Sequence, residues 1–112
     1  MDIYFKYKKY EKACNSEKES IKKWGAENAK VIRRRLAQLQ AADNLSQISH
    51  LPPPRCHQLV GRENEFAVYA KHPFRLIFEP FLDSMPRSAD GGINLKRVTA
   101  IRIIKVEDYH GK

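Results

Sequence analysis

Residues 98–106 form the run Val-Thr-Ala-Ile-Arg-Ile-Ile-Lys-Val, which is dominated by β-branched and aliphatic side chains. Such side chains favour a pleated, largely buried strand. The apolar residues occupy both alternating sets of positions, with Ala100, Ile104 and Val106 in one set and Ile101 and Ile103 in the other. Because a strand of this kind is covered on both faces, we expect it in the interior of a sheet and not at its edge.

Three titratable side chains, Asp108, Tyr109 and His110, follow in direct succession where this apolar run stops. A carboxylate, a phenol and an imidazole at the end of a rigid strand are held well enough to act together. The alternative interpretation is a polar C-terminal end that frays. The rest of the chain has to decide between the two.

The N-terminal half of the chain predicts a strand followed by helices. A strand is expected over residues 2–6, followed by a short helical piece. Ser16 and Glu19 have the spacing of a capping box, so a new helix is expected to start there, with Ile21 and Trp24 turned inward.

The main helix is expected over residues 26–43. Its apolar stripe, at i, i+3, i+7 and i+10, is made by Ala29, Ile32, Leu36 and Leu39. Successive residues turn by about 100° around a helix, so the arginines at 33–35 cannot all point the same way. At least one of them is expected to lie along the boundary of the core with its stem on apolar surface.

The second half of the chain changes to a period of two. After a proline-stiffened connection over residues 45–55, strands are expected at 56–60, 65–71, 74–81 and 98–106, with a long loop over 82–95. Short connections between consecutive strands indicate antiparallel pairing. We therefore predict a single α+β domain over residues 1–112, with helices packed on one face of a mostly antiparallel, four- to five-stranded sheet. The other face would be concave and more polar.

The charge of the chain indicates a polyanionic partner. The 112 residues carry a net charge of +8 at pH 7 and a pI near 9.7. Nucleic acid or the ribosome, an acidic protein, and a merely solvated helical face are the three interpretations. No membrane span and no signal peptide are expected, and Cys14 and Cys56 fit reduced thiols, so we expect a cytoplasmic protein.

No metal-binding spacing, phosphate loop or nucleophile elbow is present in the sequence, so we expect neither a metal nor another cofactor. The remaining candidates are His57, Arg75, Asp108, Tyr109 and His110. These residue types suit RNA cleavage by attack of a 2′-hydroxyl, which needs a base, an acid and a fixed cation. The ordinary alternatives are a sheet histidine at position 57 and an ion pair of Arg75 with Glu79.

At these residues the chain resembles the RelE/ParE superfamily of toxins from bacterial type II toxin–antitoxin systems. It is most similar to the HigB-like branch, the plasmid maintenance killer proteins. The resemblance covers nearly the whole chain. It is carried by Lys-Lys-Trp-Gly, Arg-Arg-Arg-Leu, a Leu-Pro linker, Cys-His-Gln-Leu-Val-Gly, Pro-Phe-Arg-Leu-Ile-Phe-Glu-Pro and Glu-Asp-Tyr-His-Gly.

The resemblance implies the RelE fold and a ribosome-dependent mRNA endonuclease. By position, the histidine before the turn matches His57 and the arginine of the strand matches Arg75. The terminal Asp-Tyr-His matches Asp108, Tyr109 and His110. Catalytic or RNA-contact roles for these five residues are therefore implied by similarity.

Partners follow from the same resemblance. A helix-turn-helix antitoxin encoded alongside is typical of the family, and the pair represses its own promoter, so operator DNA would be bound only through the antitoxin. The ribosome and mRNA are the expected targets, and binding by basic side chains should weaken steeply with salt. The expected RNA-binding residues are Lys22, Lys23, Lys30, Arg33, Arg34, Arg62 and Lys71.

The chain departs from the family at two places. Val60 stands where some relatives carry a lysine, so a basic contact is either missing or supplied by Arg62 or Lys71. The loop over residues 82–95 is longer than in compact relatives. Two rival functions on the same fold are a ParE-like gyrase inhibitor and a catalytically inactive module that still binds antitoxin.

Overall fold

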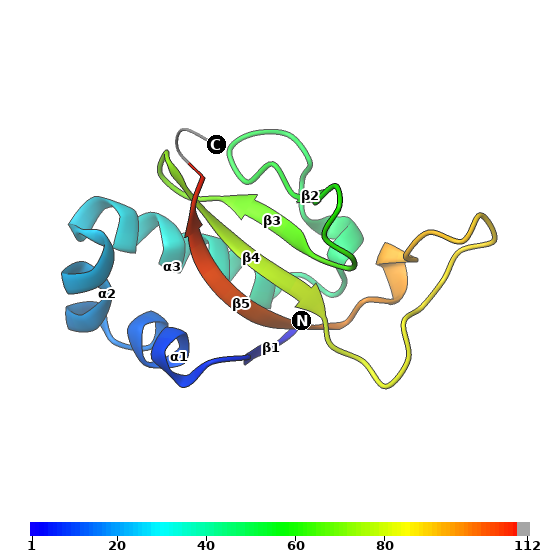
Figure 1. The fold of residues 1–112 in the computed structure, drawn as a ribbon, viewed down its shortest axis with the longest axis horizontal. Coiled ribbons are helices and arrows are strands. Elements are labelled where there is room, and N and C mark those ends of the chain that lie inside the picture. The colour runs from blue at the N-terminus through cyan, green and yellow to red at the C-terminus, as the bar shows by residue number, and fades with distance from the viewer. Residues whose placement is uncertain (110–112) are drawn as a thin grey trace.

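The computed structural model describes residues 1–109 of the 112-residue chain. The elements, in chain order, are β1 (Asp2–Phe5), α1 (Lys8–Cys14), α2 (Glu17–Trp24), α3 (Ala26–Ala41), η1 (Leu45–Gln47), β2 (His57–Gln58), β3 (Phe66–Tyr69), β4 (Phe74–Pro80), η2 (Leu95–Arg97) and β5 (Ala100–Asp108). The predicted α+β class is confirmed. Figure 1 shows α3 behind the sheet, with the opposite face of the sheet toward the viewer.

The sheet is mixed, which corrects the prediction of a mostly antiparallel one. Its strand order is β1-β5-β4-β3-β2, and β1 runs parallel to β5, while the neighbours along β5-β4-β3-β2 are antiparallel. Ile3 and Phe5 pair with Ile101 and Ile103 in this parallel register. Short connections indicate only which consecutive strands pair, so they could not reveal the partner of a strand that opens the chain. The interior position predicted for the last strand is confirmed, because β5 lies between β1 and β4.

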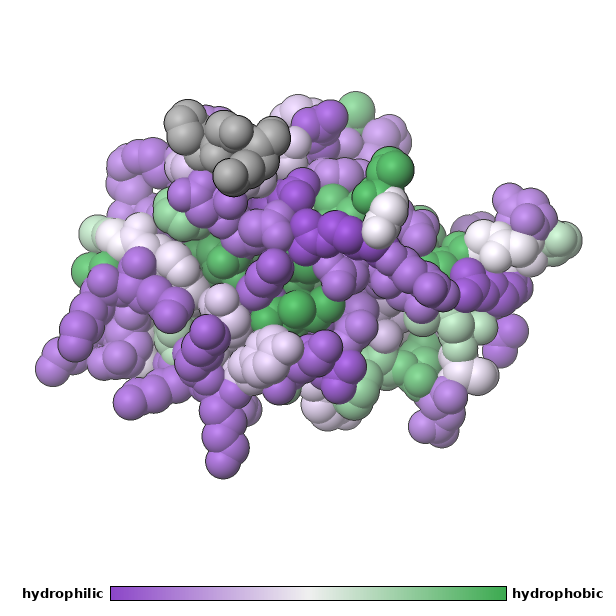
Figure 2. All heavy atoms as spheres, in the orientation of Figure 1, coloured by the Kyte–Doolittle hydropathy of each residue, from purple (hydrophilic) through white to green (hydrophobic). Residues whose placement is uncertain are grey.

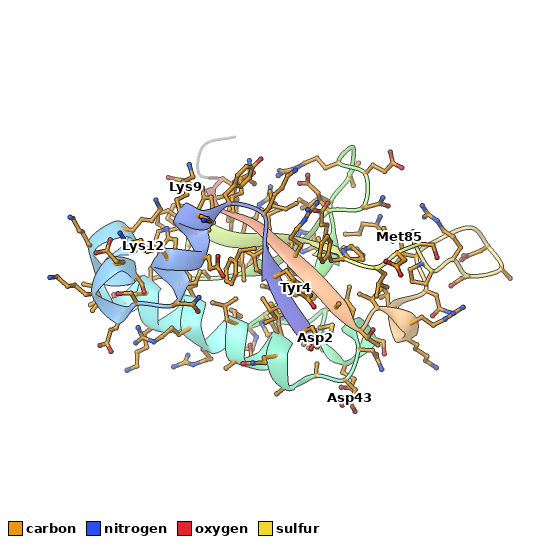
Figure 3. The ribbon with its side chains drawn as sticks, turned by 90° about the horizontal axis from the view of Figure 1, so that it is seen from below. Asp2, Tyr4, Lys9, Lys12, Asp43 and Met85 are labelled. Atoms are coloured by element: carbon orange, nitrogen blue, oxygen red, sulfur yellow. The ribbon has the colours of Figure 1, made fainter. Side chains whose placement is uncertain are left out.

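The main core lies between the helices and one face of the sheet. From α3, Ile32 and Leu39 are each 1% exposed and pack in one cluster with sheet residues such as Leu76 and Phe78. The apolar stripe predicted for the main helix is thereby confirmed. Figure 3 looks onto the β1 edge, with Asp2 and Tyr4 labelled, and shows α3 on one side of the sheet.

Helix α2 begins at the predicted capping residue, but only one of the two side chains predicted to point toward the core does so. The Ser16 hydroxyl accepts the Glu19 amide N–H at 3.2 Å, as predicted from the capping-box spacing. Ile21 is 39% exposed, so its predicted inward orientation is wrong, whereas Trp24 packs against the core as expected. Ser20 is buried instead, and its hydroxyl oxygen lies 2.8 and 2.7 Å from the carbonyl oxygens of Ala13 and Ser16, which share its single proton.

A β-bulge in β5 changes which side chains face which side. Ile77 pairs with Lys105 but Phe78 pairs with Ile103, so Ile104 is the extra residue. As a result Ile103 and Val106 both pack in the helix-side core, while Ile104 packs on the opposite face. The grouping of Val106 with Ile104 expected from simple alternation is therefore wrong. Beyond the bulge, the residue at 107 faces away from the helices.

The long connections lie where the sequence predicts them, but the strand between them at 56–60 is shorter than expected. The strand expected over 56–60 is reduced to His57–Gln58, and Val60 is 99% exposed in the turn that follows. The loop over 82–95 projects from the body of the molecule (Figure 1) and is held by a bridge between Arg87 and Ile93. Within residues 1–109, no helix is both long and apolar enough to cross a membrane.

Candidate functional site

The face of the sheet opposite the helices carries three of the five predicted catalytic residues, His57, Arg75 and Tyr109. We call it the open face. Its floor is a small apolar cluster of Ala67, Ile77 and Ile104, with Leu59 packed against it. Figure 2, seen from this side, shows apolar patches surrounded by hydrophilic side chains. The predicted polar character of this face is thereby confirmed.

Glu107 is the centre of a cationic cluster on this face. Its carboxylate accepts hydrogen bonds from Arg75 Nε at 2.8 Å and Arg62 Nη1 at 3.2 Å, and Lys105 Nζ lies 3.2 Å away. Burial of the carboxylate opposes its ionisation, but the hydrogen bonds from Arg62, Arg75 and Lys105 outweigh this and lower the pKa of Glu107 to about 2. The carboxylate is thus an anion held by three cations.

The partner of Arg75 differs from the alternative that the sequence left open. Glu79 pairs with Arg102 at 2.5 Å, whereas Arg75 pairs with Glu107 at 2.6 Å. Register explains this choice, since Arg75 lies directly opposite Glu107 and Glu79 directly opposite Arg102. Directly opposed residues have Cβ atoms about 5 Å apart, whereas Arg75 and Glu79 are four positions apart on one strand, a separation of roughly 13 Å.

Two tyrosines and two arginines form a stacked ladder at one end of the open face. The Arg75 guanidinium lies 5.0 Å from the Tyr109 ring centroid, and the Tyr109 and Tyr69 rings stack at 5.6 Å. The Arg55 guanidinium lies 5.1 Å from the Tyr69 ring centroid and donates to the Tyr69 hydroxyl at 2.6 Å. Burial and the neighbouring Tyr69 raise the pKa of the Tyr109 phenol. The ladder fixes the positions of both guanidiniums.

His57 lies at the edge of this ladder. Its ring meets the Tyr69 ring edge-on at 5.8 Å, and its Nδ1 lies 2.8 Å from the Arg55 carbonyl oxygen. A carbonyl can only accept, so Nδ1 carries the proton and Nε2 of the neutral ring is left as an acceptor. This is the tautomer that a general base requires at Nε2.

Tyr109 and Asp108, at the end of β5, lie on opposite faces of the sheet. Tyr109 joins the open-face ladder, and its backbone N–H donates to Pro73 at 3.1 Å. Asp108 pairs with Phe74, whose ring packs against the helix-side core, so Asp108 lies on the other face from Arg75 and His57. His110 lies outside the described residues. The structure therefore brings together His57, Arg75 and Tyr109 from the predicted set.

The predicted RNA-binding residues do not gather on one surface. Lys22 and Lys23 border a groove between α1 and α2 together with Lys9 and Lys12, two side chains that extend from α1 in Figure 3. Along α3, Lys30 and Arg34 are exposed, whereas Arg33 is half-buried. Lys71 pairs with Glu27 at the start of α3, whereas Arg62 reaches the open face through Glu107. Of the two cations that could replace a lysine at Val60, Arg62 is the one that reaches the site.

The boundary arginine is Arg35. It is 5% exposed, and its Nε donates to the Tyr69 carbonyl at 2.7 Å. The prediction that at least one arginine of this triplet lies along the core boundary is confirmed. Through this bond α3 holds the end of β3 that carries the Tyr69 ring.

Arg55, Tyr69 and Glu107 are site residues that sequence reasoning missed. The signal for Tyr69 was available, because strict alternation along the strand places the apolar Phe66 and Val68 on one face and residue 69 on the other. The signal for Glu107 was hidden by the bulge, which moves it to the face of Arg75. Arg55 sits in an irregular connection, where no periodicity predicts orientation.

Within residues 1–109, no three His, Cys, Asp or Glu side chains are grouped so that they could hold a metal ion. Comparisons of the chain with protein-family models, with curated proteins and with solved structures find no match.

Proposed function

We propose that this protein is a HigB-like toxin of a type II toxin–antitoxin system that cleaves mRNA on the ribosome without a metal ion. The observation that carries the proposal is the meeting of His57, Tyr109 and Arg75 on a face free of the helices, linked through Tyr69. A base, a stacking ring and a phosphate-binding fork are the parts that such a reaction needs.

In the proposed reaction the RNA supplies its own nucleophile. His57 Nε2 removes the proton of a 2′-hydroxyl, the 2′-oxygen attacks the adjacent phosphorus, and the bond to the 5′-oxygen breaks. The leaving 5′-oxygen takes a proton from the second acid–base group, a role that the resemblance gives to His110. The products are a 2′,3′-cyclic phosphate and a 5′-hydroxyl, so no water is consumed in this step.

Arg75 would stabilise the doubly charged phosphorane. For this it has to exchange the Glu107 carboxylate for phosphate oxygens, because Nε and Nη2 both face Glu107 in the structure. Arg62 and Lys105 remain to hold Glu107 when Arg75 turns to the substrate. The phosphate would thus enter a site already lined by cations.

The partners in this proposal are those of the family. A helix-turn-helix antitoxin would neutralise the toxin and carry the pair to operator DNA, and both proteins would be cytoplasmic. Basic side chains outside the open face, such as those on α1 and α2, would bind ribosomal RNA. Because Asp108 lies on the helix side of β5, away from His57, the orienting role that the resemblance gives it would have to act on His110.

The test is to incubate the purified protein with ribosomes programmed with a defined mRNA and to sequence the new RNA ends. The proposed function requires cleavage of the mRNA within the decoding site, RNA products that end in 2′,3′-cyclic phosphate, and loss of cleavage in His110→Ala. DNA breaks by gyrase with intact mRNA would establish the ParE-like alternative. Intact mRNA and intact DNA, with antitoxin still bound, would establish an inactive binding module.

A further inference from the structure

The first turn of α3 lines a cavity that the catalytic proposal does not use. The cavity has a volume of about 340 Å³ and is bordered by Gly25 to Asn28, by Lys71 and His72 from the β3–β4 turn, and by the Trp24 and Phe74 rings. It lies on α3, a helix of 16 residues, whose positive dipole end faces the cavity.

Within residues 1–109, no side chain caps the first backbone donors of α3. The helical ladder begins with the Ala29 N–H, which donates to Gly25 at 2.9 Å, so the N–H groups of residues 26–28 precede it. Gly25 is the N-cap residue and offers no side-chain oxygen. These backbone donors therefore meet the cavity without a capping side chain from residues 1–109.

A buried side-chain donor lies at the same place. Asn28 is 4% exposed, and its Oδ1 accepts the Lys71 amide at 3.2 Å. Its Nδ2 is fully buried and has no hydrogen-bond partner among the described residues. A buried amide N–H without an acceptor is unfavourable, and a ligand that reaches Asn28 from the cavity would supply the acceptor that residues 1–109 do not.

The charges around the cavity favour an anion that can compete with Glu27. Lys71 Nζ makes an ion pair with the Glu27 carboxylate, which is 79% exposed and free to move into solvent. That contact lowers the pKa of Glu27. A phosphate could take the place of this carboxylate on Lys71 and at the same time accept from the helix N–H groups.

The cavity adjoins the open-face ladder. His72 borders the cavity, and its ring meets the Tyr109 ring edge-on at 5.8 Å. Tyr109 in turn lies under Arg75, the proposed ligand of the scissile phosphate. A single RNA strand bound at Arg75 would therefore pass His72 on its way to the first turn of α3.

We propose that the first turn of α3, with Asn28 and Lys71, is a second phosphate site that binds a neighbouring phosphodiester of the RNA strand held at Arg75. The identity of this ligand rests on the proposed function, but the existence of the site is tested by phosphate binding, which does not depend on cleavage. The structural alternative is that Glu27 and Lys71 only fasten α3 to the β3–β4 turn.

The test is a titration of the full chain with inorganic phosphate, followed by backbone and side-chain amide NMR and by the fluorescence of Trp24, the single tryptophan of the chain. We expect shifts at the amides of residues 26–28 and at Asn28 Nδ2. Asn28→Asp keeps the acceptor for the Lys71 amide but places negative charge in the cavity, and should weaken phosphate binding by about tenfold or more. Glu27→Gln removes the competing carboxylate and should tighten it.

Asn15→Asp is the matched control, since it adds the same charge at an exposed position on another helix end and should leave phosphate binding unchanged. A second arm uses an oligonucleotide whose 2′-hydroxyls are absent, so that cleavage is impossible. Shifts at residues 26–28 with this oligonucleotide, lost in Asn28→Asp, would support the inference even if the wild-type protein cleaves nothing. Phosphate binding unaffected by Asn28→Asp, or an oligonucleotide that leaves these amides unshifted, would overturn it.

Discussion

Arg75 and Glu107 lie directly opposite each other on β4 and β5, and Arg75 Nη2 and Nε are 2.6 and 2.8 Å from the same carboxylate oxygen. The pair is largely buried, with side chains 17% and 16% exposed. A guanidinium held by a carboxylate is oriented before any substrate arrives, but it must release that carboxylate to bind phosphate. The same ion pair therefore contributes to the stability of the fold and holds the arginine that the proposed reaction needs.

Glu107→Gln should destabilise the fold at neutral pH. The pKa of Glu107 is about 2 in the folded protein, below the ordinary 4.5, so the ionised carboxylate adds stability that is fully present above about pH 4.5. This contribution is lost as the pH falls from 4.5 toward 2. By linkage it amounts to at most roughly 3 kcal/mol at pH 7.

Urea unfolding of wild type and Glu107→Gln at several pH values measures this difference. Glu79→Gln serves as the comparison, because Glu79 makes the equivalent cross-strand ion pair with Arg102. The gap between wild type and Glu107→Gln should close on acidification. A gap that stays constant from pH 7 to pH 2 would mean that ionisation of Glu107 is not what stabilises the cluster.

Arg75→Lys should slow mRNA cleavage by about 100-fold, because lysine keeps the charge but loses the fork that binds two phosphate oxygens. Arg102→Lys is the matched control. Arg102 lies on the same face of the sheet and makes the same kind of cross-strand pair with glutamate, but away from the ladder with Tyr109. Equal slowing in both variants would remove Arg75 from the reaction.

His57→Asn should reduce cleavage by roughly 100-fold or more, the usual contribution of a general base. The asparagine amide can still donate to the Arg55 carbonyl, which His57 Nδ1 contacts at 2.8 Å, so the local structure is retained. His50→Asn, at an exposed loop position, is the control. The melting temperature checks the fold, and full cleavage by His57→Asn would assign the base to another group.

Ser20→Ala should cost about 1–2 kcal/mol of unfolding free energy, because it removes a buried hydroxyl whose single proton is shared between two carbonyl oxygens. Ile21→Ala, at a neighbouring position that is 39% exposed, should stay within about 0.5 kcal/mol of wild type. Chemical denaturation compares the two directly. If Ile21→Ala lost more unfolding free energy than Ser20→Ala, the prediction that Ile21 points toward the core would be supported after all.

Much of the candidate site could be predicted from the sequence, and the errors along β5 have one cause, the bulge at Ile104. His57, Arg75 and Tyr109 were expected together and do meet around Tyr69. Asp108 was expected beside them but lies on the other face, because the bulge at Ile104 shifts the alternation of β5. Strand alternation can be extrapolated only as far as the strand remains regular.

From the sequence alone came the features that depend on residues a few positions apart. The cap at Ser16, the apolar stripe of α3 and the α+β class all follow from local spacing and from the order of the elements. The tertiary structure alone decided the features that depend on distant partners. These are the parallel pairing of β1 with β5, the bulge, and the choice of Glu107 as the partner of Arg75. Local spacing is set by backbone geometry, whereas strand pairing is chosen by the whole core that the strands enclose.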